Sequence, residues 1–154
     1  MKPELLDRDR SLLVLIDVQE RLYPYVHERE AMLARIDLLL SAAKLMRIPL
    51  LVTEQYRKGL GGTIEEIRKI LPDIQPLAKM DFSCVPAPGF MERLASFGRD
   101  QIVLAGIEAH ICVAQTALDL ASGGKRVYVA ADATSSRRLL DAQTALRRLE
   151  QNGL

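Results

Sequence analysis

Three reactive side chains, Asp17, Lys79 and Cys112, come at or just after short apolar runs of the sequence. A carboxylate can take the proton of a thiol, and the thiolate can then attack a carbonyl carbon. An ammonium group next to that pair would hold the charges in place. A cysteine at the start of a helix has a further advantage, because the free amides and the dipole of the first turn favour a thiolate and an oxyanion. These residue types predict nucleophilic chemistry at Cys112.

Each of these side chains also has a structural interpretation. An aspartate at the end of a strand often caps a loop, a single lysine commonly lies on the surface, and a buried cysteine is usually inert packing. Cys84, in the stretch FSCVP, is interpreted as packing of this kind. Spacing alone does not show that Asp17, Lys79 and Cys112 converge.

The elements that must position these residues alternate between strands and helices. Buried strands are expected at 11–18, 50–53, 101–106 and 126–132, with a weak strand around Lys79. Helices are expected at 28–49, 63–71, 88–98, 112–124 and 135–153, and a loop at 54–62. Thr63 and Glu66 are expected to form a capping box at the start of a helix. The alternation predicts one domain over residues 1–154, a three-layer α/β fold with a doubly wound, mainly parallel sheet.

The composition is that of an ordinary globular protein. The chain has 154 residues, 49% of them hydrophobic and 27% charged, with a formal net charge of +1. This charge gives no reason to expect a nucleic acid or an anionic membrane as partner, and no apolar run approaches the roughly 18 residues that span a bilayer. Two cysteines and no secretory signal predict a cytoplasmic protein with free thiols. The densest cationic group is interpreted as a solvated helix face: Arg137, Arg138, Arg147 and Arg148.

The stretches around the reactive residues resemble the motifs of the isochorismatase-like cysteine hydrolase superfamily, which includes nicotinamidases and related amidases. The resemblance rests on LLVLIDVQERL, LAKMDFSCV and LAGIEAHICVAQTALDL, which come in the family's order and span nearly the whole chain. It implies a catalytic triad of Asp17, Lys79 and Cys112. It also implies a cis peptide bond between Ile107 and Glu108, and an oxyanion hole formed by the backbone amides of Glu108 and Cys112.

Departures from the family pattern narrow the expected activity. The histidines and aspartate that bind a metal in nicotinamidases are missing from TEQYRKGLGGT, so no metal or other cofactor is expected. Cys112 makes the chain similar to the amidases rather than to the true isochorismatases, which lack the cysteine. The family's last strand is absent from the sequence. The resemblance therefore implies a homo-oligomer that hydrolyses a small amide or ester through a thioacyl enzyme.

The substrate pocket is expected to come from loops beside these motifs. His110 is placed in this pocket, or in a subunit interface, because the family pattern gives the role of general base to the aspartate. The expected pocket residues are Leu22, Tyr23, Tyr56, Leu60, Phe82, His110 and Ile111. Two alternatives stay open: a scaffold protein that has lost turnover, and a redox protein that uses Cys84 with Cys112. The spacing of the two cysteines is unlike a CxxC motif, which weakens the second.

Overall fold

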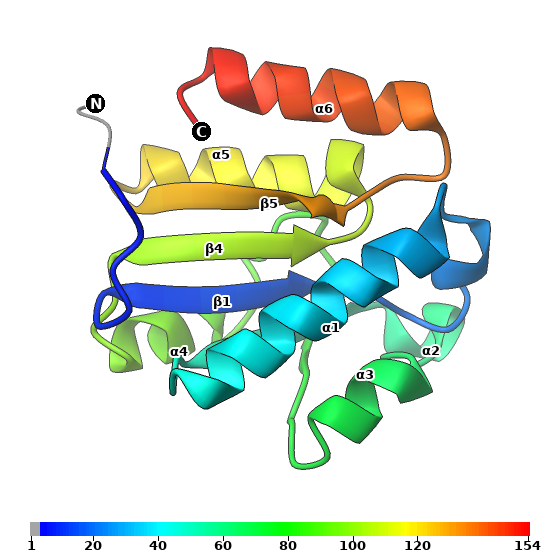
Figure 1. Cartoon of the computed structure of the whole chain (residues 1–154), viewed down its shortest axis with the longest axis horizontal. Helices are drawn as coiled ribbons and strands as arrows, with labels where there is room; N and C mark the ends of the chain where they lie inside the picture. Colours follow the sequence, from blue (N-terminus) through cyan, green and yellow to red (C-terminus); the bar gives the residue numbers. More distant parts are fainter. Residues whose placement is uncertain (1–3) are drawn as a thin grey trace.

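The computed structural model describes residues 4–154, in which five strands form one sheet with helices on both faces (Figure 1). The strands are β1 (Ser11–Ile16), β2 (Leu50–Gln55), β3 (Leu77–Lys79), β4 (Gln101–Gly106) and β5 (Arg126–Thr134). All neighbours pair in parallel, in the order β3-β2-β1-β4-β5, and β5 is an edge strand of the described sheet. The predicted three-layer, doubly wound α/β fold is confirmed. Its winding reverses between β1 and β4, where such sheets bind ligands.

The helices occupy the connections between the strands. The longer ones are α1 (Arg29–Leu45), α3 (Glu65–Ile70), α4 (Phe90–Ser96), α5 (Ala114–Ser122) and α6 (Leu139–Gln151). Three short helices complete the chain: η1 (Tyr23–Tyr25), α2 (Arg57–Leu60) and the π-helical segment η2 (Ala109–Val113), which runs directly into α5. Helices α1 and α3 cover one face of the sheet, α4 and α5 cover the other, and α6 packs against α5 and η2 (Figure 1).

The alternation of side chains along β1 divides the core into two layers. Leu12, Val14 and Ile16 pack toward α4 and α5, whereas Leu13 and Leu15 pack toward α1 and α3. Every residue of this strand is therefore buried. A strand that is covered on both faces has no solvated side, which explains its uniformly apolar sequence.

Gly106 closes β4 at a point where no side chain fits. Its backbone has φ +119°, and a Cβ atom built there would lie 2.1 Å from the carbonyl oxygen of Ile16. Positive φ and close approach to a neighbouring backbone both require glycine. The residue thus lets the chain turn from β4 toward η2 directly beside the end of β1.

Two local predictions are wrong. The segment 54–62 is not entirely loop, because it contains the one-turn helix α2, which begins after Tyr56 at φ +38°. The capping box is not formed, since Ile64 is the N-cap of α3 and no side chain caps that helix. The hydroxyl of Thr63 donates instead to the buried carboxylate of Glu54 at 2.8 Å. A buried carboxylate needs hydrogen-bond donors, and this need outweighs the capping preference.

Candidate active site

Asp17 and Lys79 form a buried ion pair, with 2.7 Å between Oδ2 and Nζ and neither side chain exposed. Oδ2 accepts no hydrogen bond of regular angle from the described residues, so this contact is an attraction between charges, which needs no fixed angle. The hydroxyl of Thr53 donates to Oδ1 at 2.7 Å. Lys79 Nζ also donates to the carbonyl oxygens of Asp81 at 3.0 Å and Phe82 at 2.9 Å. Both charges are therefore held in place on several sides.

The ends of three neighbouring strands position this pair. Asp17 directly follows β1 and has φ +53°, a left-handed conformation that aspartate tolerates better than most residues. Lys79 is the last residue of β3, and Thr53 lies near the end of β2, the strand between them. Parallel strands place their carboxyl ends at one edge of the sheet, and this brings the three polar side chains together.

Cys112 lies beside the ion pair, within η2, rather than at the opening of the α-helix as expected. The residue is 6% exposed. Its Sγ donates to Oε1 of Gln55 at 3.0 Å, and Lys79 Nζ donates to the same oxygen at 3.3 Å. The structure thus brings all three residues of the expected triad into one buried cluster.

The surroundings of Cys112 keep its thiol neutral in the free protein. Burial raises the pKa of the Cys112 thiol, and the carboxylate of Asp17 raises it further against the opposing effect of Lys79. Burial therefore opposes the stabilisation of a thiolate that is expected from the start of a helix. Burial lowers the pKa of Lys79, but the attraction and hydrogen bonding of Asp17, together with the nearby cysteines, outweigh it, so that the pKa of Lys79 is raised.

The second cysteine has the properties of a packing residue. Cys84 is fully buried, and its backbone amide donates to the hydroxyl of Thr116 at 3.0 Å. Burial raises the pKa of its thiol to about 11. Both cysteines are free thiols.

The backbone before Cys112 offers an unpaired donor. The peptide bond between Ile107 and Glu108 is cis, at the bond for which the motif led us to expect it. The carbonyl oxygen of Glu108 accepts hydrogen bonds from the amides of Ile111 at 3.1 Å and Val113 at 3.2 Å. Within the described residues the amide of Glu108 itself donates none, which leaves it free for an oxygen atom of a ligand.

The side chain of Glu108 ties this backbone to the segment before α6. Its carboxylate is 5% exposed and accepts hydrogen bonds from the backbone amide and from Nε of Arg137, each at 3.0 Å. Arg137 is exposed as expected, but it lies before α6 rather than on a face of that helix. The amide of Ala109 donates to the carbonyl oxygen of Ser135 at 2.8 Å and makes a second link to the same segment.

The expected pocket residues do not share a described cavity. Leu22 and Tyr23 pack with the α1 side of the core and Ile111 with the α5 side, while Tyr56 and Phe82 are about half exposed.

His110 lines a separate cavity of about 340 Å³ together with residues of α5 and α6. The Nδ1 atom of its ring lies 2.9 Å from the hydroxyl oxygen of Ser136. Leu60, at the end of α2, contributes its carbonyl oxygen as acceptor for the amide of Arg21.

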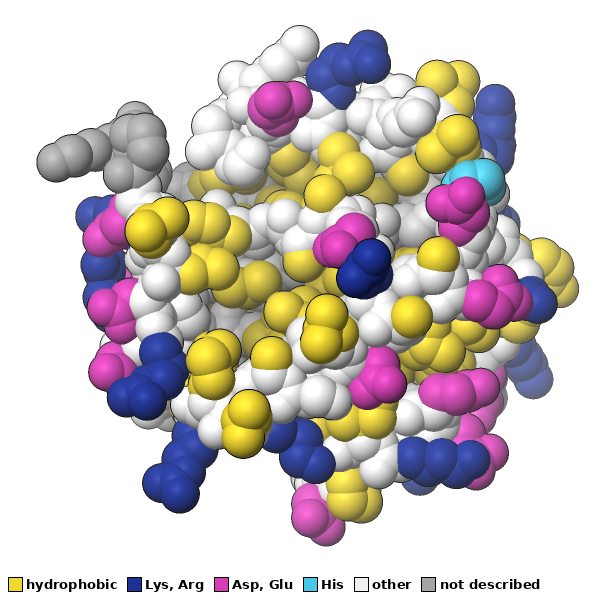
Figure 2. Space-filling view, in the orientation of Figure 1, with side chains coloured by type: hydrophobic (Ala, Val, Ile, Leu, Met, Phe, Trp, Pro, Cys, Tyr) yellow, Lys and Arg dark blue, Asp and Glu magenta, His cyan; other side chains and the backbone are white. Residues whose placement is uncertain are grey.

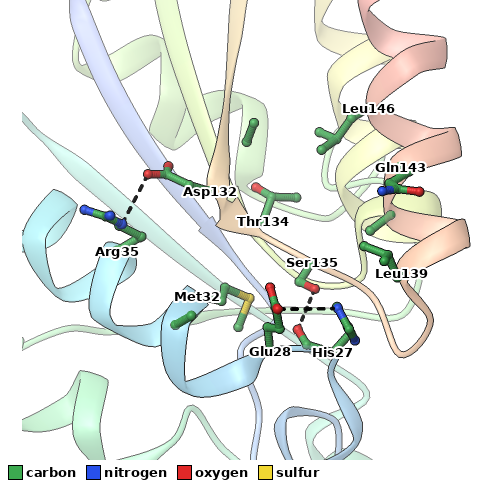
Figure 3. A pocket seen from close by; sticks show the side chains of 13 residues that line it. His27, Glu28, Met32, Arg35, Asp132, Thr134, Ser135, Leu139, Gln143 and Leu146 are labelled. Atoms are coloured by element: carbon green, nitrogen blue, oxygen red, sulfur yellow. Dashed lines mark hydrogen bonds and ion pairs between the residues drawn. The ribbon is translucent and has the colours of Figure 1, made fainter.

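Another cavity, of about 260 Å³, lies at the carboxyl end of β5 between α1 and α6 (Figure 3). Asp132 and Arg35 face each other at 3.5 Å on one side, and the hydroxyl of Ser135 donates to the carbonyl oxygen of His27 on another. The buried hydroxyl of Thr134 has no partner among the described residues. This cavity belongs to the sheet edge and does not include the triad.

The sequence predictions missed the residues that connect the triad. Thr53 and Gln55 contact Asp17, Lys79 and Cys112, yet neither was expected in the site. Both are polar residues at the end of a buried strand that neighbours the predicted strands of the site. Asp17 was singled out because it is a polar residue at the carboxyl end of a buried strand, and the same criterion selects Thr53 and Gln55.

The described residues offer neither a cluster of metal ligands nor a membrane-spanning helix. Among residues 4–154, no three His, Cys, Asp or Glu side chains lie together in an arrangement that could hold a metal ion. Over the same residues, every helix is too short or too polar to cross a membrane. On the face shown in Figure 2, acidic and basic side chains are interspersed rather than gathered by sign.

Comparison with known proteins places the chain among relatives with this fold. Isochorismatase domain-containing protein 2 of Danio rerio is 39% identical over 145 residues, which cover 94% of this chain and 72% of that protein. The structure of the MAR1 ribonuclease from Caenorhabditis elegans has a TM-score of 0.89 and 34% identity, over 96% of this chain and 76% of that one. The YcaC gene product of Escherichia coli, described as an octameric hydrolase of unknown specificity, has a TM-score of 0.91 and 25% identity, over 99% and 78%.

The match to a family model agrees with these relatives. The model of the isochorismatase domain covers residues 11–154, from the first residue of β1 to the last residue of the chain. The sheet order, the buried polar cluster and the similarity over nearly the whole length all lead to one assignment: the chain belongs to the isochorismatase family of hydrolases.

Proposed function

We propose that this protein hydrolyses a small amide, or an ester, through a covalent thioacyl intermediate on Cys112. The observation that carries the proposal is the fully buried ion pair of Asp17 and Lys79 beside a nearly buried thiol. Burying two charges is costly, so such a pair next to a nucleophile favours chemistry over stability as its role.

The first half of the reaction forms the acyl enzyme. Asp17 takes the proton of Cys112, so that the S–H bond breaks as the sulfur bonds to the carbonyl carbon. The backbone amides of Glu108 and Cys112 stabilise the oxyanion that develops on the carbonyl oxygen. Asp17 then gives its proton to the leaving amine, and the C–N bond breaks. Lys79 stays charged throughout and keeps the carboxylate oriented.

The second half releases the acid. A water molecule attacks the thioester, and Asp17 takes its proton as general base. The C–S bond breaks, and the sulfur regains the proton from Asp17. The neutral resting thiol of Cys112 fits this scheme, because its raised pKa makes proton transfer to Asp17 a necessary part of the attack.

Ammonia release from a panel of small primary amides tests the proposal. The wild type should release ammonia from at least one amide of the panel, and Cys112→Ala should not. Cys84→Ala is the matched control, because it removes the other thiol without touching the proposed nucleophile. A wild type that never exceeds Cys112→Ala on any amide or ester would refute hydrolysis and support the scaffold alternative.

The partner of this proposed site is a small molecule, and the residues of the site supply every proton transfer without a metal or other cofactor. Homo-oligomerisation is proposed on the octameric state described for the YcaC gene product. The mass in solution, measured by light scattering after size exclusion, tests it. A monomer at micromolar concentration would contradict this part.

Cleavage of RNA is a second candidate, favoured by the ribonuclease name of a neighbour with 34% identity. The net charge of +1 and the interspersed charges of Figure 2 give little attraction for a phosphate backbone. A fluorogenic RNA substrate in the same assay distinguishes the two. RNA cleavage that persists in Cys112→Ala would assign that activity to another site or to a contaminant.

A further inference from the structure

Gln55 makes side-chain contacts with two members of the triad. Its Oε1 accepts hydrogen bonds from Cys112 Sγ at 3.0 Å and from Lys79 Nζ at 3.3 Å, and its Nε2 donates to the carbonyl oxygen of Met80 at 3.3 Å. An ammonium group has donors only, so the atom that faces Lys79 must be the amide oxygen. It follows that the thiol of Cys112 points its proton at Gln55.

The backbone of Gln55 is fixed independently of this side chain. The fully buried Gln19 accepts a hydrogen bond from the amide of Gln55 at 2.7 Å and donates to its carbonyl oxygen at 2.9 Å. Gln55 is also in register with Lys79 across β2 and β3. Replacing the side-chain amide therefore leaves the end of the strand in place.

The charged and titratable groups around the thiol include a second acceptor, the carboxylate of Asp17. Asp17 faces it from the end of β1, Lys79 from β3, and Cys84 from the segment before α4. Asp17 Oδ2 accepts no regular hydrogen bond from the described residues. The thiol thus has two acceptors within its cluster: the amide oxygen of Gln55, which lies 3.0 Å from Sγ, and the carboxylate of Asp17, whose hydrogen bonding also raises the pKa of the thiol.

We propose that Gln55 is a positioning residue that holds the Cys112 thiol as a neutral hydrogen-bond donor in the free protein. The hydrogen bond to its amide oxygen stabilises the S–H form and so opposes ionisation. When the carbonyl group of a substrate takes the place of this amide oxygen, the thiol proton turns to Asp17 Oδ2. The S–H bond then breaks, an O–H bond forms on Asp17, and the electron pair of the sulfur forms the S–C bond. This last step rests on the proposed function, whereas the first part concerns the free protein alone.

The rate at which iodoacetamide alkylates Cys112 at pH 7 tests the first part without any substrate. Gln55→Leu removes the acceptor and should speed alkylation about fivefold, the factor that corresponds to the loss of one ordinary hydrogen bond. Gln55→Glu keeps an acceptor and adds a negative charge beside the sulfur, so alkylation should be slower than in the wild type. Mass spectrometry of the peptide that contains Cys112 separates its labelling from that of Cys84.

Gln115→Leu is the matched control, because Gln115 is an exposed glutamine of α5, three residues after Cys112. Its rate should equal that of the wild type. If Gln55→Leu does not fold, Gln55→Met takes its place with the same expected acceleration, because a thioether is only a weak acceptor.

Opposite shifts in the Leu and Glu variants distinguish this role from a structural one, which would move both rates in the same direction. Rates that move together, or that stay within twofold of the wild type in both variants, would overturn the proposal. An amide panel without turnover would refute the proposed function and leave this comparison of rates unaffected.

Discussion

Removal of either member of the buried Asp17–Lys79 pair should destabilise the fold, but by unequal amounts. After Asp17→Asn, the Lys79 ammonium still donates to the carbonyl oxygens of Asp81 and Phe82 and to the side chain of Gln55. After Lys79→Met, the Asp17 carboxylate keeps the hydroxyl donor on Oδ1, while Oδ2 loses its cation. The carboxylate therefore loses a larger share of its compensation than the ammonium does.

The expected free energies follow from this difference. Breaking a buried ion pair by removing one partner costs about 3–5 kcal/mol. We expect a loss of about 5 kcal/mol in the free energy of unfolding for Lys79→Met. For Asp17→Asn we expect a loss of about 3 kcal/mol, because Lys79 keeps its other hydrogen-bond acceptors. The double variant carries neither charge, so it should be more stable than Lys79→Met by about 2 kcal/mol. The free energy of unfolding of native domains is about 5–15 kcal/mol. A loss of about 5 kcal/mol would therefore bring Lys79→Met close to unfolding if the wild type lies near the lower end of this range.

Urea denaturation followed by circular dichroism measures these free energies, with the slope against urea compared among all variants. Lys79→Met should be more destabilised than Asp17→Asn, and the double variant should be less destabilised than the sum of the two. Additive costs would contradict a buried ion pair, and a larger cost for Asp17→Asn would contradict the unequal compensation of the two charges.

Three more predictions concern the same region. Burial and a nearby carboxylate raise the pKa of the Cys112 thiol, so its alkylation rate should rise about tenfold per pH unit from pH 7 to 9. A rate that reaches a plateau near neutral pH would contradict this. Gly106→Ala should lower the free energy of unfolding in urea by about 3 kcal/mol or more, whereas Gly98→Ala, where a Cβ meets nothing within 4 Å, should lower it by about 1 kcal/mol. Equal losses would contradict the close approach of Gly106 to β1. Arg137→Ala removes the half-exposed guanidinium partner of Glu108 but leaves the backbone amide donor, so thermal unfolding should show a loss of stability of about 1 kcal/mol. A loss above about 3 kcal/mol would contradict this arrangement.

Much of the fold was readable in local sequence features. The strand over Gln101–Gly106 was predicted with its observed bounds, and β1 within two residues, because strands covered on both faces have uniformly apolar sequences. Position at the end of such a strand also singled out Asp17 and Lys79, since the carboxyl ends of parallel strands share one edge of the sheet. The capping box at Thr63 failed because a distant buried carboxylate, Glu54, competes for the hydroxyl.

The sequence by itself determined the class of the sheet, and the resemblance of its motifs to a known family singled out Asp17, Lys79 and Cys112 as an expected triad. Only the tertiary structure decided how they meet: through Thr53 and Gln55 of β2, which lies between β1 and β3 and is distant from Cys112 in sequence. It also decided that the pKa of the Cys112 thiol is raised. A pattern of residue types cannot supply that result, because ionisation depends on burial and on charges that strand pairing brings close.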